Sequence, residues 1–160
     1  MRGTLAPHLE EFIGQLNQAA EQAIKDGVVP TPELARTNLA KLSAFVTKSP
    51  DIAFMQNSEL VIKSHNIPVR IYSPAPDERL PVLLYFHGGG HMCGDTQMYD
   101  PMCRKIALAA NCVVISVEYR LAPEHPYPAG LDDAELVLRH YQTLLTDVGF
   151  NNQIMVGGDS

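Results

Sequence analysis

The sequence predicts an α/β protein in which antiparallel strands lead into an alternating, mostly parallel sheet. Two continuous apolar runs, residues 81–86 and 112–117, are typical of strands that are buried on both faces. A short helical segment at about residues 101–110 separates them, and this order predicts a βαβ crossover. Before these runs, apolar residues alternate with polar ones over 60–62 and 69–71, which predicts an antiparallel hairpin with one solvated face.

The segment before the hairpin is predicted to be helical. Residues 5–27 carry apolar side chains at helical spacing until Gly27 ends the pattern. A second helix is expected to begin at residues 31–32 and to end before 49–50, with one apolar face formed by Leu39, Leu42 and Val46. The polar faces are mixed rather than rich in Lys and Arg, so packing onto the protein is favoured over docking on a membrane surface.

A longer helix is predicted from Ala129 to Val148, followed by an apolar strand that begins at residues 154–156. Asp132 and Asp133 lie in its opening turn, where the helix dipole favours carboxylates. Neighbouring helical positions point about 100° apart, so the two are interpreted as helix-start residues rather than as paired catalytic carboxylates.

Composition and charge exclude several classes of function. The 160 residues are 46% hydrophobic and 19% charged, which is typical of a folded globular protein. The net charge of −6 argues against a protein whose main role is to bind the phosphates of nucleic acid. Three cysteines without a CxxC pair favour a reducing compartment, and no apolar segment resembles a signal peptide or a membrane span. We therefore expect a soluble, cytoplasmic protein.

Two motifs follow predicted strands and can carry chemistry. The loop His87-Gly88-Gly89-Gly90-His91 could bring backbone N–H groups close to a ligand. It lacks the GxGxxG spacing of a dinucleotide loop and the GK[ST] ending of a P-loop, which leaves a simple tight turn or an oxyanion hole of the HGGG type. The second motif, Gly158-Asp159-Ser160, matches the first three positions of a G-x-S-x-G nucleophile elbow.

Taken together with two further motifs, the chain resembles the hormone-sensitive-lipase family of α/β-hydrolases over roughly residues 55–160. The N-terminal helices resemble that family's cap segment in position and character. The order and spacing of four motifs carry the resemblance: His87-Gly88-Gly89-Gly90, the run from Glu118 to Ala129 (EYRLAPEHPYPA), Asp132-Asp133-Ala134 and Gly158-Asp159-Ser160.

The resemblance implies the α/β-hydrolase fold, with an eight-stranded, mostly parallel sheet of which this chain holds about the first five strands. Residues 1–50 would form the helical cap segment, and 51–160 the first half of the catalytic domain. The implied site consists of the nucleophile Ser160, the oxyanion-hole glycines Gly89 and Gly90 with Gly88 shaping their loop, the supporting residues His87 and Asp159, and the acyl-pocket residues His91 and Met92.

The implied activity is that of a serine carboxylesterase or lipase that hydrolyses short- to medium-chain acyl esters through an acyl-enzyme on Ser160. The partner is then a small-molecule ester, no metal or organic cofactor is expected, and the triad acid and histidine lie beyond residue 160. Two alternatives stay open: a non-catalytic small-ligand-binding protein, as among plant hormone receptors of this fold, and an amide deacetylase that uses the same triad. The sequence is compatible with a homo-oligomer and does not define one.

The sequence gives less support for a catalytic or metal-binding role of the other histidines and motifs. His91 is disfavoured as the catalytic base because the triad histidine of this family comes late in the chain. His91 and Cys93 are too few ligands for a zinc site. The prolines of Tyr119–Pro128 predict a rigid crossover in which Arg120 and Glu124 satisfy buried polar groups, and His125 and His140 are assigned to structure or solvent.

The sequence ends in what is predicted to be a strand-to-helix turn, at the candidate nucleophile itself. We therefore expect these residues to be part of a larger chain that supplies the remaining strands and the general base. Residues 1–160 alone are expected to be insoluble or molten and to lack esterase activity above background.

Overall fold

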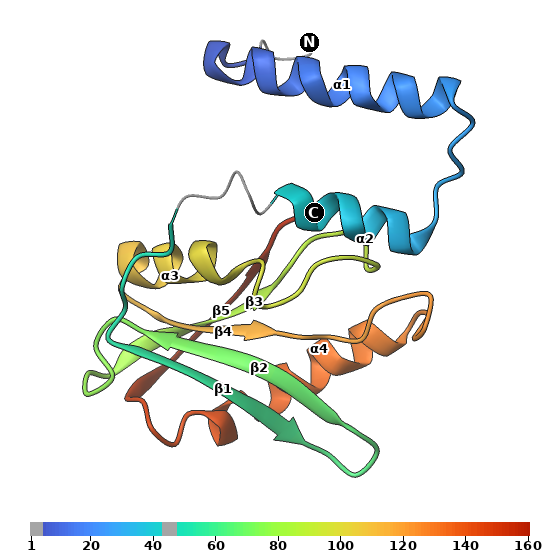
Figure 1. Cartoon of the computed structure of the whole chain (residues 1–160). Coiled ribbons are helices and arrows are strands. Elements are labelled where there is room, and N and C mark those ends of the chain that lie inside the picture. The colour runs from blue at the N-terminus through green and yellow to red at the C-terminus, as the bar shows by residue number, and fades with distance from the viewer. Residues whose placement is uncertain (1–4, 43–47) are drawn as a thin grey trace. The chain divides into compact units, whose positions relative to one another are not determined.

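The computed structural model describes residues 5–42 and 48–160, and the chain divides into two compact units between Thr31 and Pro32. In the first unit, a 3₁₀ turn at Pro7–Leu9 leads into α1, Glu10–Lys25 (Figure 1). Acidic residues in the first turn of α1 and Lys25 in its last turn complement the helix dipole. This confirms the predicted first helix.

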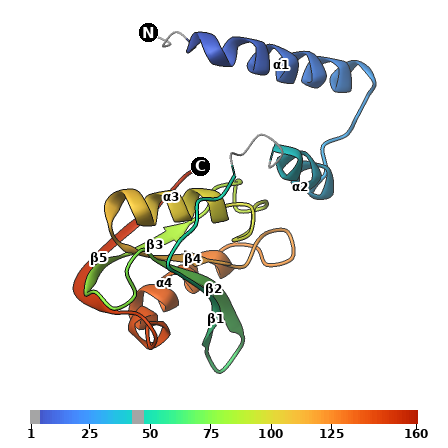
Figure 2. The same cartoon turned by 60° about the vertical axis from the view of Figure 1, so that its left-hand side comes forward.

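The second unit contains a five-stranded mixed sheet in the order β1-β2-β4-β3-β5 (Figures 1 and 2). The β1/β2 and β2/β4 pairs are antiparallel, whereas β4/β3 and β3/β5 are parallel. The sheet therefore confirms the predicted hairpin and the alternating α/β arrangement after it. The strands are β1 Phe54–Val61, β2 Asn66–Ser73, β3 Leu80–Phe86, β4 Val113–Val117 and β5 Phe150–Gly158.

Helices cover both faces of this sheet. On one face, α4, Ala129–His140, closes a core that includes Val82, Leu84 and Val137. On the other face, α3, Asp100–Ala110, packs over a smaller cluster that includes Tyr85 and Cys103. Successive residues of a strand point to opposite faces, so a strand covered on both sides must be apolar throughout. The five residues of β4 are all buried, as the continuous apolar run predicts.

Two predicted helices differ from the observed ones. The helix predicted from Ala129 to Val148 ends at His140, and a 3₁₀ turn, Tyr141–Leu144, follows. The apolar residues of that stretch are nevertheless buried in the core, because 3₁₀ spacing also returns side chains to one face. The second predicted helix is α2, Pro32–Lys41, and Val46 of its predicted apolar face lies outside the described residues.

Asp133, which the sequence predicted to be a helix-start residue, lies early in α4 and also belongs to a buried network. Its side chain is buried, and its carboxylate accepts hydrogen bonds from Arg120 Nη2 at 2.8 Å and from the Arg120 backbone N–H at 2.9 Å. His65 Nε2, from the β1–β2 turn, lies 2.7 Å from the same carboxylate. Burial alone would raise the pKa of Asp133, but Arg120 and His65 hold it below its ordinary value. The buried network therefore ties α4 to the crossover after β4 and to the hairpin.

The cysteines and helices give two further findings. Cys93, Cys103 and Cys112 are free and buried. Burial raises the pKa of Cys103 to about 11 and also raises that of Cys112, so both are neutral thiols at neutral pH. Within the described ranges, none of the helices combines the length and the apolar character needed to cross a membrane.

Candidate active site

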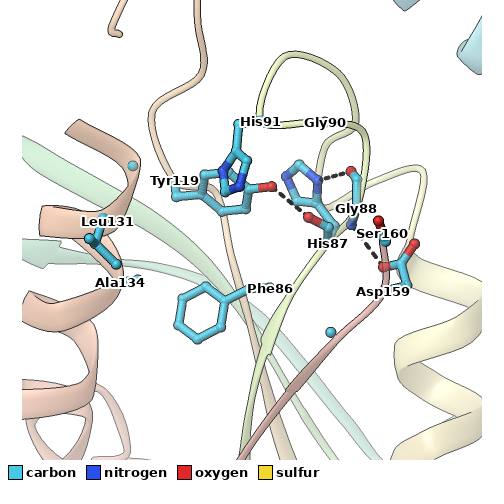
Figure 3. Close-up of a pocket in the computed structure, with 12 residues that line it drawn as sticks. Phe86, His87, Gly88, Gly90, His91, Tyr119, Leu131, Ala134, Asp159 and Ser160 are labelled. Atoms are coloured by element: carbon cyan, nitrogen blue, oxygen red, sulfur yellow. Dashed lines mark hydrogen bonds between the residues drawn. The ribbon is translucent and has the colours of Figure 1, made fainter. Parts of the chain in front are cut away.

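The two predicted motifs meet at one edge of the sheet. Strands β3 and β5 are parallel neighbours, and their register pairs Phe86 with Gly158. The residues that follow each strand therefore emerge side by side at the carboxyl edge, where α/β proteins commonly bind ligands. Figure 3 shows the resulting arrangement, with the loop that begins at His87 beside Asp159 and Ser160.

The glycine loop is a tight turn with an unusual backbone conformation. The Gly89 carbonyl accepts hydrogen bonds from the N–H groups of Met92, at 3.1 Å, and Cys93, at 3.0 Å. Gly89, Gly90 and His91 have φ values of 120°, 63° and 57°, all in the left-handed region. A Cβ atom at Gly89 would overlap the backbone of Cys93, so only glycine fits there.

Within the described part of the chain, the N–H groups of Gly89, Gly90 and His91 donate to no protein acceptor, whereas those of the flanking Gly88 and Met92 do. A group of consecutive unsatisfied backbone donors in left-handed residues forms a concavity suited to an anion.

Gly88 packs directly against the candidate nucleophile. Its N–H donates to Asp159 Oδ1 at 2.8 Å. A Cβ atom at this position would lie 2.6 Å from Asp159 Oδ2 and 2.8 Å from the carbonyl carbon of Ser160. Real Cβ atoms do not approach so closely, so glycine is required for the loop to contact the serine backbone.

Asp159 fixes this contact by accepting from three donors. Besides the Gly88 N–H, the hydroxyl of Tyr85 donates to it at 2.6 Å and that of Tyr99 at 2.9 Å. Burial alone would raise the pKa of Asp159, but these three donors hold it below its ordinary value. Burial and the nearby carboxylate raise the pKa of Tyr99 to about 12 and that of Tyr85 further. At neutral pH the carboxylate is therefore ionised and both phenols are neutral donors.

His87 is a buried structural member of the site. Its ring stacks between Tyr119, with centroids 4.6 Å apart, and Tyr99, at 5.3 Å. Nδ1 lies 2.9 Å from the Gly88 carbonyl, to which it donates, and the Tyr119 hydroxyl donates to the His87 carbonyl at 2.5 Å (Figure 3). Nε2 is buried and has no hydrogen-bond partner among the described residues. The ring thus braces the first peptide of the loop.

A pocket of about 340 Å³ opens beside the loop. One wall is apolar and includes Phe86, Leu131 and Ala134, while the other carries the polar residues of the two motifs (Figure 3). A second pocket of about 370 Å³ shares His91, Gly130 and Leu131 with the first and extends to Tyr127. Apolar clefts with a few convergent polar groups are typical small-molecule sites.

The structure brings together most of the site residues that the sequence singled out. The pocket is lined by His87, Gly88, Gly90, His91, Asp159 and Ser160. Gly89 and Met92 are absent from that lining: Gly89 packs against Cys93, and the Met92 carbonyl accepts a hydrogen bond from Arg36.

Sequence reasoning missed three residues that hold the site. Tyr85 and Tyr99 were not singled out, although a phenol inside an apolar strand normally needs a hydrogen-bond partner, and this could have drawn attention to Tyr85. No comparable feature of the sequence indicates a role for Arg36. Glu124, expected to satisfy buried polar groups, is instead half exposed and pairs with Arg36.

The site offers no evident metal centre. In the part of the chain that the structure describes, no group of three or more His, Cys, Asp or Glu side chains could hold a metal ion. His91 is exposed and Cys93 is buried, which also argues against their acting as a pair of ligands.

The strand order, the glycine loop after β3 and the serine after β5 together define an α/β hydrolase. Residues 83–160 match the family model that is described as alpha/beta hydrolase fold. These residues therefore belong to the α/β-hydrolase fold, and the chain is similar to proteins named as carboxylesterases.

Named relatives and solved structures agree with this assignment. Over 137 residues, 84% of this chain, it is 39% identical to carboxylesterase NlhH of Mycobacterium tuberculosis, and over 138 residues, 85% of the chain, it is 43% identical to the gibberellin receptor GID1A of Arabidopsis thaliana. The chain spans 42% and 37% of these relatives' lengths.

Among solved structures, an ester hydrolase from the metagenome of Lake Arreo superimposes with a TM-score of 0.83 at 31% identity, covering 98% of this chain and 51% of the other. The esterase of Pyrobaculum calidifontis superimposes with a TM-score of 0.78 at 32% identity, covering 98% and 50%. The chain thus spans about half the length of these esterases.

Proposed function

We propose that this chain is the first half of a serine carboxylesterase that hydrolyses short- to medium-chain acyl esters. The observation that carries the proposal is the direct contact between the glycine loop and the Ser160 backbone at the edge of one pocket. The relatives named carboxylesterase, esterase and carboxylic ester hydrolase support it.

In this mechanism the Ser160 hydroxyl attacks the ester carbonyl and its proton passes to a histidine, which in this fold follows the nucleophile in the chain. The carbonyl oxygen becomes an oxyanion, and the free N–H groups of Gly89 and Gly90 stabilise it. Collapse of the intermediate breaks the ester bond, releases the alcohol with the proton from the histidine, and leaves an acyl group on Ser160. Water then hydrolyses the acyl-enzyme by the same steps.

The remaining residues of the site serve this chemistry indirectly. Asp159 holds the glycine loop beside the nucleophile through its bond to Gly88, and His87 fixes the Gly88 carbonyl. Leu131 and Phe86 offer apolar surface to the acyl or alcohol group, and His91 forms the boundary between the two pockets. The size of these pockets suits substrates with short or medium chains.

The rest of the fold would come from residues that follow Ser160. Strand β5 has apolar side chains exposed along its length: Ile154, Met155 and Val156 are 37%, 44% and 61% exposed. In the complete hydrolase sheet, the strands and helices after the nucleophile would cover this surface, as the implied eight-stranded sheet requires. The triad acid and histidine belong to the same segment.

A second function is favoured by one observation, the 43% identity to a gibberellin receptor. A non-catalytic binding protein of this fold could use the same pocket and glycine loop to hold a small ligand. The discriminating feature is turnover, because a receptor binds without hydrolysing. Amide deacetylation by the same triad is distinguished from ester hydrolysis only by comparing matched ester and amide substrates.

The test is hydrolysis of p-nitrophenyl butyrate by the full-length gene product, with Ser160→Ala as the key variant and Ser64→Ala, an exposed serine of the β1–β2 turn, as control. We expect Ser160→Ala to lower kcat by about 10⁶-fold, the loss typical of removing a serine nucleophile, and Ser64→Ala to leave it unchanged. Undiminished hydrolysis by the Ser160→Ala variant would overturn the proposal. A wild-type protein without turnover would favour the binding protein.

A further inference from the structure

One guanidinium joins α2 to the two loops that border the pocket. Arg36 Nε donates to the Met92 carbonyl at 2.8 Å, and Nη2 donates to the Ala122 carbonyl at 3.0 Å. The two terminal nitrogens also hold the Glu124 carboxylate in a bidentate pair, at 2.8 and 2.7 Å. Four of the five N–H donors of a guanidinium are thus used, on three separate groups.

Both carbonyls belong to segments that determine the shape of the glycine loop. Met92 closes the turn through its N–H bond to Gly89, and the neighbouring His91 carbonyl accepts from the Ala122 N–H at 2.9 Å. The glycine loop and the loop after β4 are therefore linked twice. The His91 carbonyl is bound directly by the Ala122 N–H, and the Met92 carbonyl is joined to the Ala122 carbonyl through Arg36.

The glycine loop needs such external support. Three successive residues, Gly89 to His91, have left-handed φ values, and His91 is not glycine, so its backbone is in a region that such residues rarely adopt. The N–H groups of Gly89 and Gly90 have no protein acceptor in the described part of the chain, so no hydrogen bond of their own fixes their direction. Their orientation depends on how the ends of the loop are held.

The charges in this cluster persist over the working pH range. The hydrogen bonds from Arg36 lower the pKa of Glu124 to about 2, and those bonds to Glu124 raise the pKa of Arg36. The side chains are 34% and 54% exposed, and exposed ion pairs contribute little to stability. The fixed geometry of the fork, rather than the strength of the ion pair, is therefore its main consequence.

We propose that Arg36 is a positioning residue for the oxyanion hole: by holding the Met92 and Ala122 carbonyls, it orients the N–H groups of Gly89 and Gly90 toward the reacting carbonyl. This inference rests on the proposed esterase function. It gives α2 a role in turnover, whereas the sequence suggested only a cap segment. Lysine cannot replace Arg36 in this role, because an ammonium group lacks the planar fork.

The experiment compares Arg36→Lys and Arg36→Ala in the full-length gene product with Arg139→Ala. Arg139 is a matched control because it is an exposed arginine of α4 whose partner among the described residues is Glu135, one turn away. The measurements are kcat and KM for p-nitrophenyl butyrate, and Tm by circular dichroism. Ser160→Ala, measured in parallel, reports whether hydrolysis depends on the proposed nucleophile.

We expect both Arg36 variants to lower kcat by about 10- to 100-fold with KM within about threefold of wild type, because a misplacement of about 1 Å at an oxyanion donor has effects of this size. Tm should stay close to that of Arg139→Ala, since an exposed pair adds little stability. Arg36→Lys should not restore kcat, although it retains the charge.

Three results would overturn the inference while leaving the esterase proposal intact, provided that Ser160→Ala is inactive: an unchanged kcat in Arg36→Ala, a raised KM with unchanged kcat, or full rescue by Arg36→Lys. A loss of kcat that is matched by a large fall in Tm would likewise overturn it, since it would assign Arg36 to folding. Wild-type protein that hydrolyses no ester, or hydrolysis that survives Ser160→Ala, would overturn both proposals together.

Discussion

Replacing Asp159 by Asn should show how much the carboxylate contributes to the contact between the loop and the nucleophile. The change keeps the shape of the side chain and removes its charge. An amide oxygen can still accept from Tyr85 and Gly88, and the new NH₂ group can donate to the Tyr99 hydroxyl. The two retained bonds change from charge-assisted to neutral, which costs about 1 kcal/mol each. We therefore expect the free energy of unfolding to fall by about 2 kcal/mol at pH 7.

The pH dependence of this difference follows from the lowered pKa of Asp159. A carboxylate whose pKa is lower in the folded state stabilises the protein above its ordinary value of 3.8, and that contribution is lost as the pH falls through the lowered value. The difference between wild type and Asp159→Asn should thus be constant from pH 7 to about 5 and shrink below 3.8.

Urea unfolding of the full-length gene product at several pH values measures this difference. Asp77→Asn, at an exposed position in the turn between β2 and β3, is the control and should change stability by less than about 0.5 kcal/mol. If Asp159→Asn were as stable as wild type at pH 7, or if its deficit grew as the pH fell, the assigned role of the carboxylate would be refuted.

Three more predictions concern packing around the site. Asp133→Asn should lower the free energy of unfolding by about 3 kcal/mol, because it removes the buried charge that pairs with Arg120 and sets an NH₂ group against the Arg120 backbone N–H, whereas the exposed Asp132→Asn should have little effect; urea unfolding compares them. Gly88→Ala should lower kcat about 100-fold, since its Cβ displaces the loop from Ser160, while Gly14→Ala, with open space in α1, should leave kcat unchanged in the same ester assay. Cys103, with a pKa of about 11, should react with a thiol reagent at least about 100-fold faster in urea than in the native protein, and equal rates would contradict its burial.

The strands could be predicted because burial determines their sequence pattern directly. The continuous apolar run of β4 and the alternation in β1 follow from the number of covered faces, and both are visible in one stretch of sequence. The end of α4 could not be predicted in the same way, because 3₁₀ turns after His140 bury the same apolar side chains as a helix would. The buried contacts of Asp133 could not be predicted from a local pattern, because they join α4 to Arg120 in the preceding loop and to His65, 68 residues away.

The same contrast holds for the site. The glycines of the loop and Ser160 follow strands directly, so a local motif indicates them. Arg36 lies 56 residues from Met92 and 86 from Ala122, and Tyr85 lies 74 from Asp159. Such contacts form only when the chain has folded, and no local pattern of residue types predicts them.

The most direct test of the account is covalent labelling of the nucleophile. The full-length gene product is treated with a fluorophosphonate, which phosphonylates activated serines, and the residual esterase activity and the modified peptide are then determined by assay and mass spectrometry. The account predicts one adduct per chain, on Ser160, with activity lost in proportion to labelling and no adduct in Ser160→Ala. Esterase activity that is lost through an adduct on another residue, or that persists when Ser160 is fully labelled, would contradict it.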